Sequence, residues 1–311
     1  MYKNYKNQWS GVDNHIADDY INFCKKASEN NQIFDTFRSH EDYGVILEGG
    51  QKRIGLANLR QIKKLGGYKW FKENFNEIKK NDLYGNPFIH NFGDSIICSS
   101  STIQYARDVY NCILLLKKSS KNKFRICEVG GGFGGFARLA ISLLKIEKYY
   151  LIDQAEPLNL AEKYLKKYPN ILSKVELISS KNVFEKIQES NSFDLFIASS
   201  SLAELDFQTQ KFYFESCIKK SNNIFLEYNT IHLEGVEKFI RKELNELLLQ
   251  GYNLKIHNPW FNGLFIYISK DFLHKKILGY ENDKFWNYLH SFKFKINKLG
   301  RYIRLKLTGK Y

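Results

Sequence analysis

Along the central part of the chain, short apolar runs alternate with segments in which apolar residues recur at helical spacing. Short, mostly apolar runs of strand length occur at residues 124–129, 149–153, 175–178, 193–198 and 224–228. Between these runs, apolar residues recur every three or four positions, which is typical of amphipathic helices. Strands that alternate with helices in this way predict an α/β fold with a mostly parallel, Rossmann-like sheet and right-handed crossovers.

The expected helices have recognisable ends. They cover residues 103–117, 136–144, 161–168, 207–219 and 234–249. Ser101 or Thr102 is the expected N-cap of the first helix, Pro169 stops the third, and Gly251 follows the last. Helices therefore fill the connections between the strands, as a parallel sheet requires.

The periodic region closes with two strands of a different kind. Residues 252–256 and 264–269 are strand-like and are joined by a short loop that contains Pro259. A connection this short predicts that the two strands pair in antiparallel fashion.

The chain before residue 96 has a different pattern. Residues 18–26 and 56–65 carry apolar side chains at helical spacing, and no strand alternation occurs before about residue 85. A loop with Gly85, Asn86 and Pro87 as breakers follows. The predicted organisation is a helical cap or substrate region at 1–95, a main domain at 96–270 and a tail at 271–311.

Composition places the chain among globular proteins. Its 311 residues are 43% hydrophobic, the mean hydropathy is -0.42, and no apolar run is long enough to span a membrane. The start lacks the apolar segment of a secretory signal. The five cysteines are scattered and include no Cys-x-x-Cys pair, which indicates neither a zinc site nor a disulfide framework. We therefore expect a cytoplasmic protein.

The formal net charge of +14 is unevenly distributed. From Lys284 to the end there are eight basic residues and no acidic residue. In the same segment, apolar residues recur at intervals of three or four from Phe285 to Leu307. This pattern is typical of an interfacial helix on anionic lipid at the inner face of the membrane, and also of a stripe packed on the domain. The asymmetry indicates a local anionic partner of the tail.

The rest of the chain is organised around residues 124–139. A buried strand ends at Val129, five glycines follow, and a helix begins at about Phe136. Glycines are needed where the backbone turns sharply and a ligand approaches it closely, and the helix N-terminus offers free N–H groups. The spacing of the glycines fits the dinucleotide fingerprint and also the turn that binds S-adenosylmethionine (SAM), so the glycines alone do not decide.

Two features favour SAM. Glu128 suits the ammonium of a methionine moiety and would repel a pyrophosphate. The closing antiparallel pair separates the sheet of class I methyltransferases from the dinucleotide fold, whose sheet is all parallel. Asp153 ends the second strand and suits the ribose hydroxyls of either cofactor. The expected cofactor-binding residues are Glu128, Gly130, Gly132, Gly134, Asp153, Gln154, Ser199 and Ser200.

Several of these segments resemble a family of bacterial sugar O-methyltransferases. The matching segments are Tyr84–Phe88, Ser100–Thr102, Glu128–Gly135, Tyr150–Asp153, Leu158–Leu165, Phe193–Leu195 and Ser201–Glu204. The resemblance covers roughly half of the chain. It implies a class I SAM-dependent fold and methyl transfer to a sugar hydroxyl of a cell-surface glycan or its precursor.

An alcohol is a weak nucleophile at neutral pH, so such a site needs a general base or a metal. Ligands bind at the carboxyl ends of the strands, where Glu204 follows the fourth strand and His232 the fifth. Each is a candidate base. The alternatives are a surface or capping histidine and a first-turn carboxylate favoured by the helix dipole. No Asp-x-Asp or His-x-x-x-His spacing occurs, so we expect no metal.

Other functions fit parts of the sequence. An NAD(P)-dependent oxidoreductase would use the same turn, and a methyltransferase could act on another small molecule or on nucleic acid. A SAM-fold protein without activity also fits. The pI of about 9.3 favours nucleic acid. However, the Asn/Asp-Pro-Pro-Tyr loop for flipped bases is absent after Ala198, so we expect no nucleic-acid partner.

Overall fold

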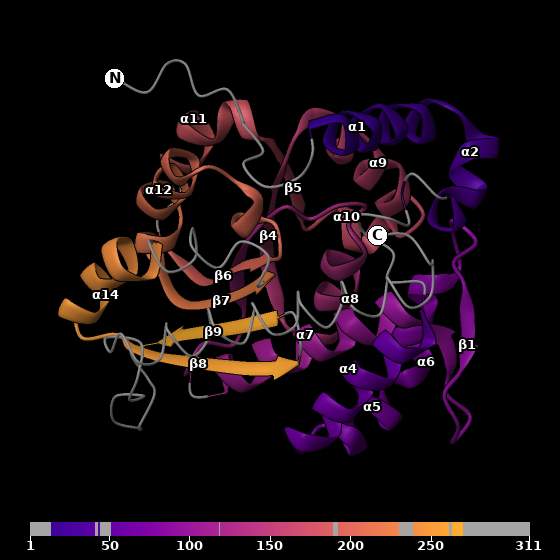
Figure 1. The fold of residues 1–311 in the computed structure, drawn as a ribbon, viewed down its shortest axis with the longest axis horizontal. Coiled ribbons are helices and arrows are strands. Elements are labelled where there is room, and N and C mark those ends of the chain that lie inside the picture. Colours follow the sequence, from indigo (N-terminus) through magenta and orange to yellow (C-terminus); the bar gives the residue numbers. More distant parts are fainter. Residues whose placement is uncertain are drawn as a thin grey trace, which may run out of the picture.

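The computed structural model describes residues 14–40, 43, 51–117, 119–188, 192–229, 239–260 and 263–269. Seven strands form the main sheet, in the order β5-β4-β3-β6-β7-β9-β8 (Figure 1). They are β3 (Phe124–Val129), β4 (Ile146–Asp153), β5 (Val175–Ser179), β6 (Phe193–Ser199), β7 (Ser221–Asn229), β8 (Asn253–Trp260) and β9 (Gly263–Ser269).

Strand β9 is the only strand of this described sheet that runs against the others. It lies between β7 and β8 and pairs with both in antiparallel fashion, whereas β3 to β7 pair in parallel. This order and these directions define the class I methyltransferase sheet. The prediction of a mostly parallel sheet with a closing antiparallel pair is therefore confirmed.

Helices cover both faces of the sheet (Figure 1). On one side lie α7 (Ser100–Leu116), α8 (Gly135–Leu143), α9 (Ala155–Leu165) and α10 (Pro169–Leu172). On the other lie α11 (Val183–Gln188), α12 (Phe207–Ser216) and α14 (Asn245–Leu249). The result is a three-layer α/β/α arrangement, because each face of the sheet needs its own apolar cover.

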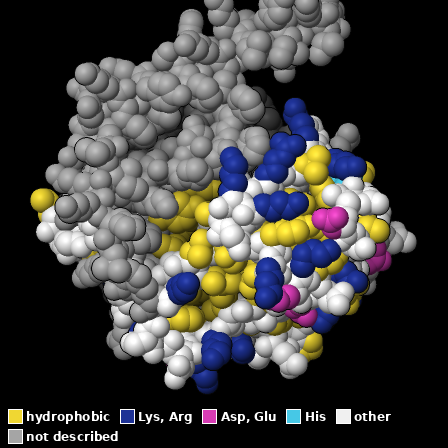
Figure 2. Space-filling model, turned by 90° about the horizontal axis from the view of Figure 1, so that it is seen from below, with side chains coloured by type: hydrophobic (Ala, Val, Ile, Leu, Met, Phe, Trp, Pro, Cys, Tyr) yellow, Lys and Arg dark blue, Asp and Glu magenta, His cyan; other side chains and the backbone are white. Residues whose placement is uncertain are grey.

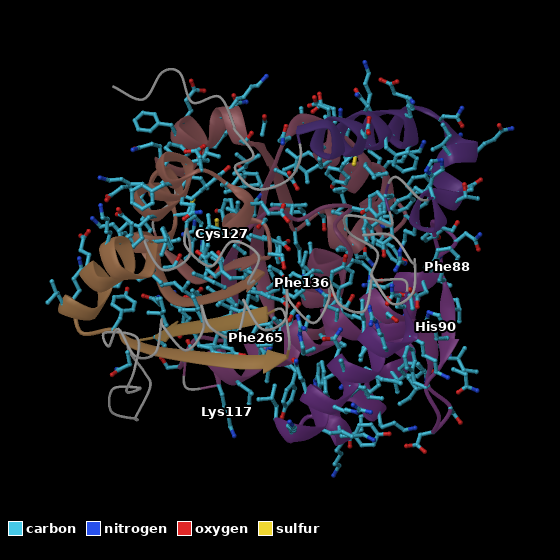
Figure 3. The ribbon with its side chains drawn as sticks, in the orientation of Figure 1. Phe88, His90, Lys117, Cys127, Phe136 and Phe265 are labelled. Atoms are coloured by element: carbon cyan, nitrogen blue, oxygen red, sulfur yellow. The ribbon has the colours of Figure 1, made fainter. Side chains whose placement is uncertain are left out.

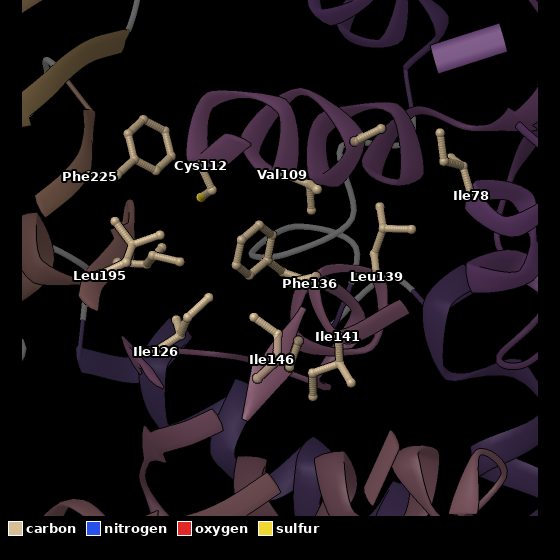
Figure 4. Close-up of a cluster of buried hydrophobic side chains, with 14 of the residues drawn as sticks. Ile78, Val109, Cys112, Ile126, Phe136, Leu139, Ile141, Ile146, Leu195 and Phe225 are labelled. Atoms are coloured by element: carbon tan, nitrogen blue, oxygen red, sulfur yellow. The ribbon is translucent and has the colours of Figure 1, made fainter. Parts of the chain in front are cut away.

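The alternation of side chains along each strand divides the core into two clusters. On β3, Cys127 and Val129 face the α11–α12 side, while Ile126 faces α7 and α8. Figure 4 shows the second cluster, in which Phe136 of α8 lies among side chains of the sheet and of α7. Because both faces are buried, the strands read as continuous apolar runs in the sequence.

The segment before α7 folds as a cap of short helices and one hairpin. It contains α1 (Asn14–Glu29), α2 (Asn31–Thr36), η1 (Phe37–Ser39), α4 (Lys52–Lys64), α5 (Tyr68–Glu73), α6 (Phe75–Ile78), η2 (Lys79–Asp82), β1 (Ile89–Asn91) and β2 (Ile97–Ser99). Helix α1 packs on α9 and α4 packs on α7. The hairpin was not predicted, because strands of three residues are too short to show an alternation.

A buried arginine joins the cap to α7. Arg38 Nη1 donates to Asp82 Oδ1 at 3.1 Å, and its Nη2 donates to Ser99 Oγ at 3.0 Å and Ser101 Oγ at 2.9 Å. The Thr102 hydroxyl donates to the same Asp82 oxygen at 2.8 Å. Side chains of the Ser-Ser-Thr segment thus hold the cap in place.

This junction corrects the predicted start of α7. The N-cap is Ser99, whose Oγ accepts from the Thr102 N–H at 3.1 Å, and not Ser101 or Thr102. The prediction was wrong because the backbone is extended at Ser99 (φ -76°, ψ 159°) and helical from Ser100 onward, so Ser101 and Thr102 already lie in the first turn.

Two prolines also lie in unexpected places. Helix α9 begins at Ala155, six residues earlier than predicted, because Pro157 lies in its first turn, where a missing N–H costs little. Pro259 lies within strand β8 and not in a loop. It is tolerated there because β8 is an edge strand whose pairing with β9 is irregular between His257 and Trp260.

Some predictions fall outside the described residues. They include the tail at 271–311, His232 and the first part of the helix expected at 234–249. Of that helix, residues 239–249 are described, and they include a π-helical turn (Ile240–Leu244) and α14. The limits of the predicted domains stay a prediction. Within the described ranges, we find no helix with the length and apolar character needed to cross a membrane.

Candidate active site

The turn between β3 and α8 has a backbone that only glycine adopts easily. Gly130, Gly132 and Gly134 have φ values of 80°, 54° and 82°. A Cβ on Gly130 would lie 2.1 Å from the Cβ of Ser201, so this glycine also permits close packing. The Gly130 N–H donates to the carbonyl of Ile152 at 2.8 Å, which ties the turn to β4.

Asp153 ends β4 directly beside this turn. Its two carboxylate oxygens accept from the backbone N–H groups of Gly132 at 3.1 Å and of Gln154 at 2.8 Å. Burial raises the pKa of Asp153 to about 6, although both hydrogen bonds favour its charged form. Each oxygen keeps further acceptor capacity, so the carboxylate is fixed in position and still able to bind a ligand.

The loop after β6 forms the opposite wall. The Ser199 hydroxyl donates to Glu227 Oε2 at 2.7 Å, and the Ser200 N–H donates to the carbonyl of the same Glu227 at 2.8 Å. The hydroxyl of Ser201 donates to the carbonyl of Val129. Ser200 has a φ of 66°, a conformation that a non-glycine residue adopts only where the surroundings impose it. The contacts to Glu227 supply that constraint.

These elements enclose a cavity of about 740 Å³, a volume that includes space open to solvent. Its lining includes six of the predicted cofactor-binding residues, Gly130, Gly132, Asp153, Gln154, Ser199 and Ser200, and the predicted base Glu204. It lies at the carboxyl ends of β3, β4 and β6, where the strand order reverses and α/β proteins bind ligands. The structure thus brings together residues that are up to 74 positions apart in the sequence.

Glu204 contributes a carboxyl group that titrates near neutral pH. It belongs to the 3-10 turn η4 (Leu202–Glu204). Burial, with a smaller effect of the charge of Asp153, raises its pKa to about 7. A carboxylate with such a pKa is suited to take up a proton at neutral pH.

Two of the predicted residues that the structure describes do not line this cavity. Glu128 is 3% exposed, and one of its carboxylate oxygens accepts from the Tyr149 hydroxyl at 2.7 Å beneath the turn. Gly134 is the N-cap of α8 and packs near Leu165 of α9. His232 lies outside the described residues. Direct cofactor contact by Glu128 or Gly134, and base catalysis by His232, stay predictions.

The buried carboxyl of Glu128 predicts a pH-dependent stability. Burial raises its pKa to about 8, despite the hydrogen bond from Tyr149, whereas an unfolded glutamate titrates near about 4.3. Between these values the folded chain holds a proton that the unfolded chain has lost. The free energy of unfolding should therefore fall as the pH rises from about 5 to about 8.

Urea unfolding at several pH values tests this prediction. Glu128→Gln should flatten part of the fall, whereas Glu185→Gln, at an exposed position of α11, should leave it unchanged. Equal slopes for wild type and Glu128→Gln would mean that Glu128 titrates near its ordinary value.

Sequence reasoning missed a buried ionic network behind the cavity. Arg107 of α7 donates to Asn58 of α4 at 2.7 Å, to Asp108 at 2.8 Å and to Glu227 of β7 at 2.7 Å. Glu227 in turn accepts from Ser199 of the cavity wall. The network thus connects the cap to the cavity.

One helix of the cap also reaches the cavity. Tyr20 of α1 is 3% exposed and lines it. The apolar spacing of α1 predicted a core position for Tyr20, and only the packing of α1 on α9 shows that this position adjoins the cavity. Among the described residues there is no group of three or more His, Cys, Asp or Glu residues that could hold a metal ion.

Comparisons with known proteins bear on the fold alone. No protein-family model matches the chain, and no curated protein matches it. Similar solved structures include TrmK from M. capricolum in complex with S-adenosylhomocysteine (SAH), with 17% identity over 61% of this chain and 85% of TrmK, at a TM-score of 0.41. An rRNA methylase from Streptococcus thermophilus has 13% identity over 52% and 95% of the two chains, at a TM-score of 0.41. The DhpI–SAM–HEP complex has 13% identity over 64% and 94%, at 0.37.

Proposed function

We propose that this protein is a SAM-dependent O-methyltransferase. The observation that carries the proposal is the position of Asp153, a half-buried carboxylate fixed beside the glycine turn in a cavity at the reversal point of a class I sheet. The antiparallel strand β9 weighs against an NAD(P)-dependent oxidoreductase, whose sheet would be all parallel.

The residues of the cavity fit this cofactor. Asp153 has free lone pairs for two ribose hydroxyls, and the positive φ of Gly130 and Gly132 lets a ligand approach the backbone closely. Leu205 and Tyr213 line the cavity and offer apolar surface to a purine ring. When bound, SAM would supply an activated methyl group on a sulfonium, and the protein would orient the acceptor and exclude water.

Calorimetry tests the choice of cofactor. SAM and its product SAH should bind, while NAD and NADP should not. Asp153→Ala should weaken SAH binding by on the order of 2 kcal/mol, through loss of charge-assisted hydrogen bonds. Asp35→Ala, on the exposed side of α2, is the control and should keep the wild-type affinity. Binding of a nicotinamide cofactor without SAH binding would refute the proposal.

Glu204 is the base that the described residues support best. It lines the cavity, and its pKa of about 7 suits proton uptake from a hydroxyl. Glu204→Gln should lower methyl transfer by about 10²-fold with SAH affinity kept, and the wild-type rate should fall as the pH drops below about 7. Transfer of labelled methyl groups from SAM to a glycan extract measures both effects. If Glu204→Gln is fully active, Glu204 is not the general base, and His232 becomes the candidate.

We propose a sugar hydroxyl of a cell-surface glycan or its precursor as the acceptor. This finer assignment rests on the family resemblance alone. The geometry of the cavity adds no support, because none of the residues in the matching segments Tyr84–Phe88 and Ser100–Thr102 lines it. A glycan mass profile of cells with and without the gene tests it directly. Loss of one methyl-sized mass difference supports the assignment, and an unchanged profile contradicts it.

A further inference from the structure

A second basic segment lies in the cap, apart from the cavity. Residues 51–72 contain seven basic residues and no acidic residue, and all seven are exposed. They are Lys52, Arg53, Arg60, Lys63, Lys64, Lys69 and Lys72. Together with the eight basic residues after position 283, they leave 32 basic and 33 acidic residues in the remainder of the chain. The net positive charge is therefore concentrated in two segments.

The packing of α4 explains why these cations gather on one surface. Its apolar side chains Leu59 and Ile62 are buried in the cluster that also contains residues of α7, so its basic side chains point to water. We call the exposed side of α4 and α5, with the adjoining end of α7, the α4–α5 face. In Figure 1 it lies at the bottom of the molecule.

Apolar side chains lie among these cations. Trp70 of α5 is half-buried, and its ring centroid is 5.1 Å from that of Tyr110 on α7. Leu114 follows Tyr110 by about one turn and is 39% exposed, and Lys117 lies one turn further, pointing away from the molecule in Figure 3. Figure 2 shows this side of the molecule, where apolar side chains lie between lysines and arginines.

The β1–β2 hairpin extends the apolar surface at one edge. It is fixed to α5, because the Tyr68 hydroxyl donates to Asp94 Oδ2 at 2.7 Å. Its side chains Phe88, Ile89 and Ile97 are each about half exposed, and Figure 3 shows Phe88 and His90 at this outer edge. Contiguous exposed apolar side chains rimmed by polar or charged residues often mark a site where a protein binds a partner or a membrane.

We propose that the α4–α5 face docks on an anionic lipid bilayer. Lysines and arginines around apolar side chains match a surface whose headgroups are negative and whose interface accepts Trp, Tyr and Leu side chains. A single-stranded nucleic acid would instead favour aromatic rings that are free to stack on bases, whereas Trp70 and Tyr110 pack on each other. The proposal is independent of the enzymatic one and of the tail.

Sedimentation of the full chain with vesicles of 30% phosphatidylglycerol tests the proposal. The variant Lys52→Gln, Lys64→Gln, Lys69→Gln removes three exposed cations from the face, and should weaken binding by at least about tenfold. The control Lys26→Gln, Lys186→Gln, Lys211→Gln removes three exposed lysines from α1, α11 and α12, at the same change in net charge. It should weaken binding by less than about twofold, and wild-type binding should fall as salt rises.

Three results would overturn the proposal. One is that the wild-type chain binds these anionic vesicles no better than vesicles of neutral lipid. Another is that the face variant binds as well as the control, which would move the contact to another basic segment. The third is tight binding of bulk tRNA, lost in the face variant, without any vesicle binding. Thermal unfolding of both variants, measured in parallel, shows that they are folded, so the result does not depend on the enzymatic proposal.

Discussion

Replacing Arg107 by methionine is expected to destabilise the folded chain by about 3–5 kcal/mol. Arg107 is 3% exposed, and its guanidinium binds two carboxylates, those of Asp108 and Glu227. Methionine fills a similar volume but leaves the buried Asp108 and the half-buried Glu227 without their cation. Urea unfolding at pH 8 measures the loss.

The pH dependence of this loss separates an electrostatic cause from a packing defect. Burial already raises the pKa of Asp108 to about 7 against the lowering effect of Arg107. Without the arginine, the folded-state pKa of Asp108 rises further above its unfolded value, so stability is lost as the pH rises. The destabilisation should therefore be smaller at pH 5.5 than at pH 8.

Arg125 offers a matched control. Its side chain is half-buried and donates to the Tyr150 hydroxyl at 2.8 Å, and no described ion pair joins it to a carboxylate. Arg125→Met should cost about 1 kcal/mol. If Arg107→Met costs no more than this control, or costs the same at both pH values, the network does not stabilise the fold as described.

The local parts of the cavity could be predicted from the sequence. The glycine turn and Asp153 each follow a strand whose apolar run is continuous, so their order along the chain fixes their place at the carboxyl edge of the sheet. The antiparallel pair 253–269 was predictable because its connection is short. These features depend on residues that are close in sequence.

The buried network could not be predicted in the same way. Arg107 and Glu227 are 120 positions apart, and Asn58 comes from the cap. An arginine within an amphipathic helix is normally exposed, so its sequence position gives no sign that three elements pack around it. Only the tertiary arrangement shows the partners.

The burial of Glu128 could have been predicted from the alternation of side chains along β3. Its type and spacing favour a ligand of the cofactor, but side chains alternate along a strand. It shares the α7–α8 face of the sheet with Ile126, whereas Val129 on the opposite face lines the cavity. The period of the strand therefore already indicates that its carboxyl lies beneath the turn, beside Tyr149.

Gly130→Ala is expected to weaken SAH binding by on the order of 2–3 kcal/mol, or roughly 30- to 160-fold in affinity. Two costs combine at this position. The φ of 80° disfavours any residue with a side chain, and the new Cβ would lie 2.1 Å from the Cβ of Ser201. Either the turn or the loop after β6 must move, and both are walls of the cavity.

Gly66→Ala carries the first cost without the second, so comparing the two variants isolates the effect of the clash with Ser201. Gly66 has nearly the same φ, 79°, but no atom lies within 4 Å of the position its Cβ would take. This variant should lose about 1 kcal/mol of stability from backbone strain and keep the wild-type SAH affinity. Calorimetry with SAH and thermal unfolding of both variants make the comparison. If Gly130→Ala is folded and binds SAH as tightly as Gly66→Ala does, the turn does not contact the cofactor, and the proposed site must lie elsewhere on the sheet.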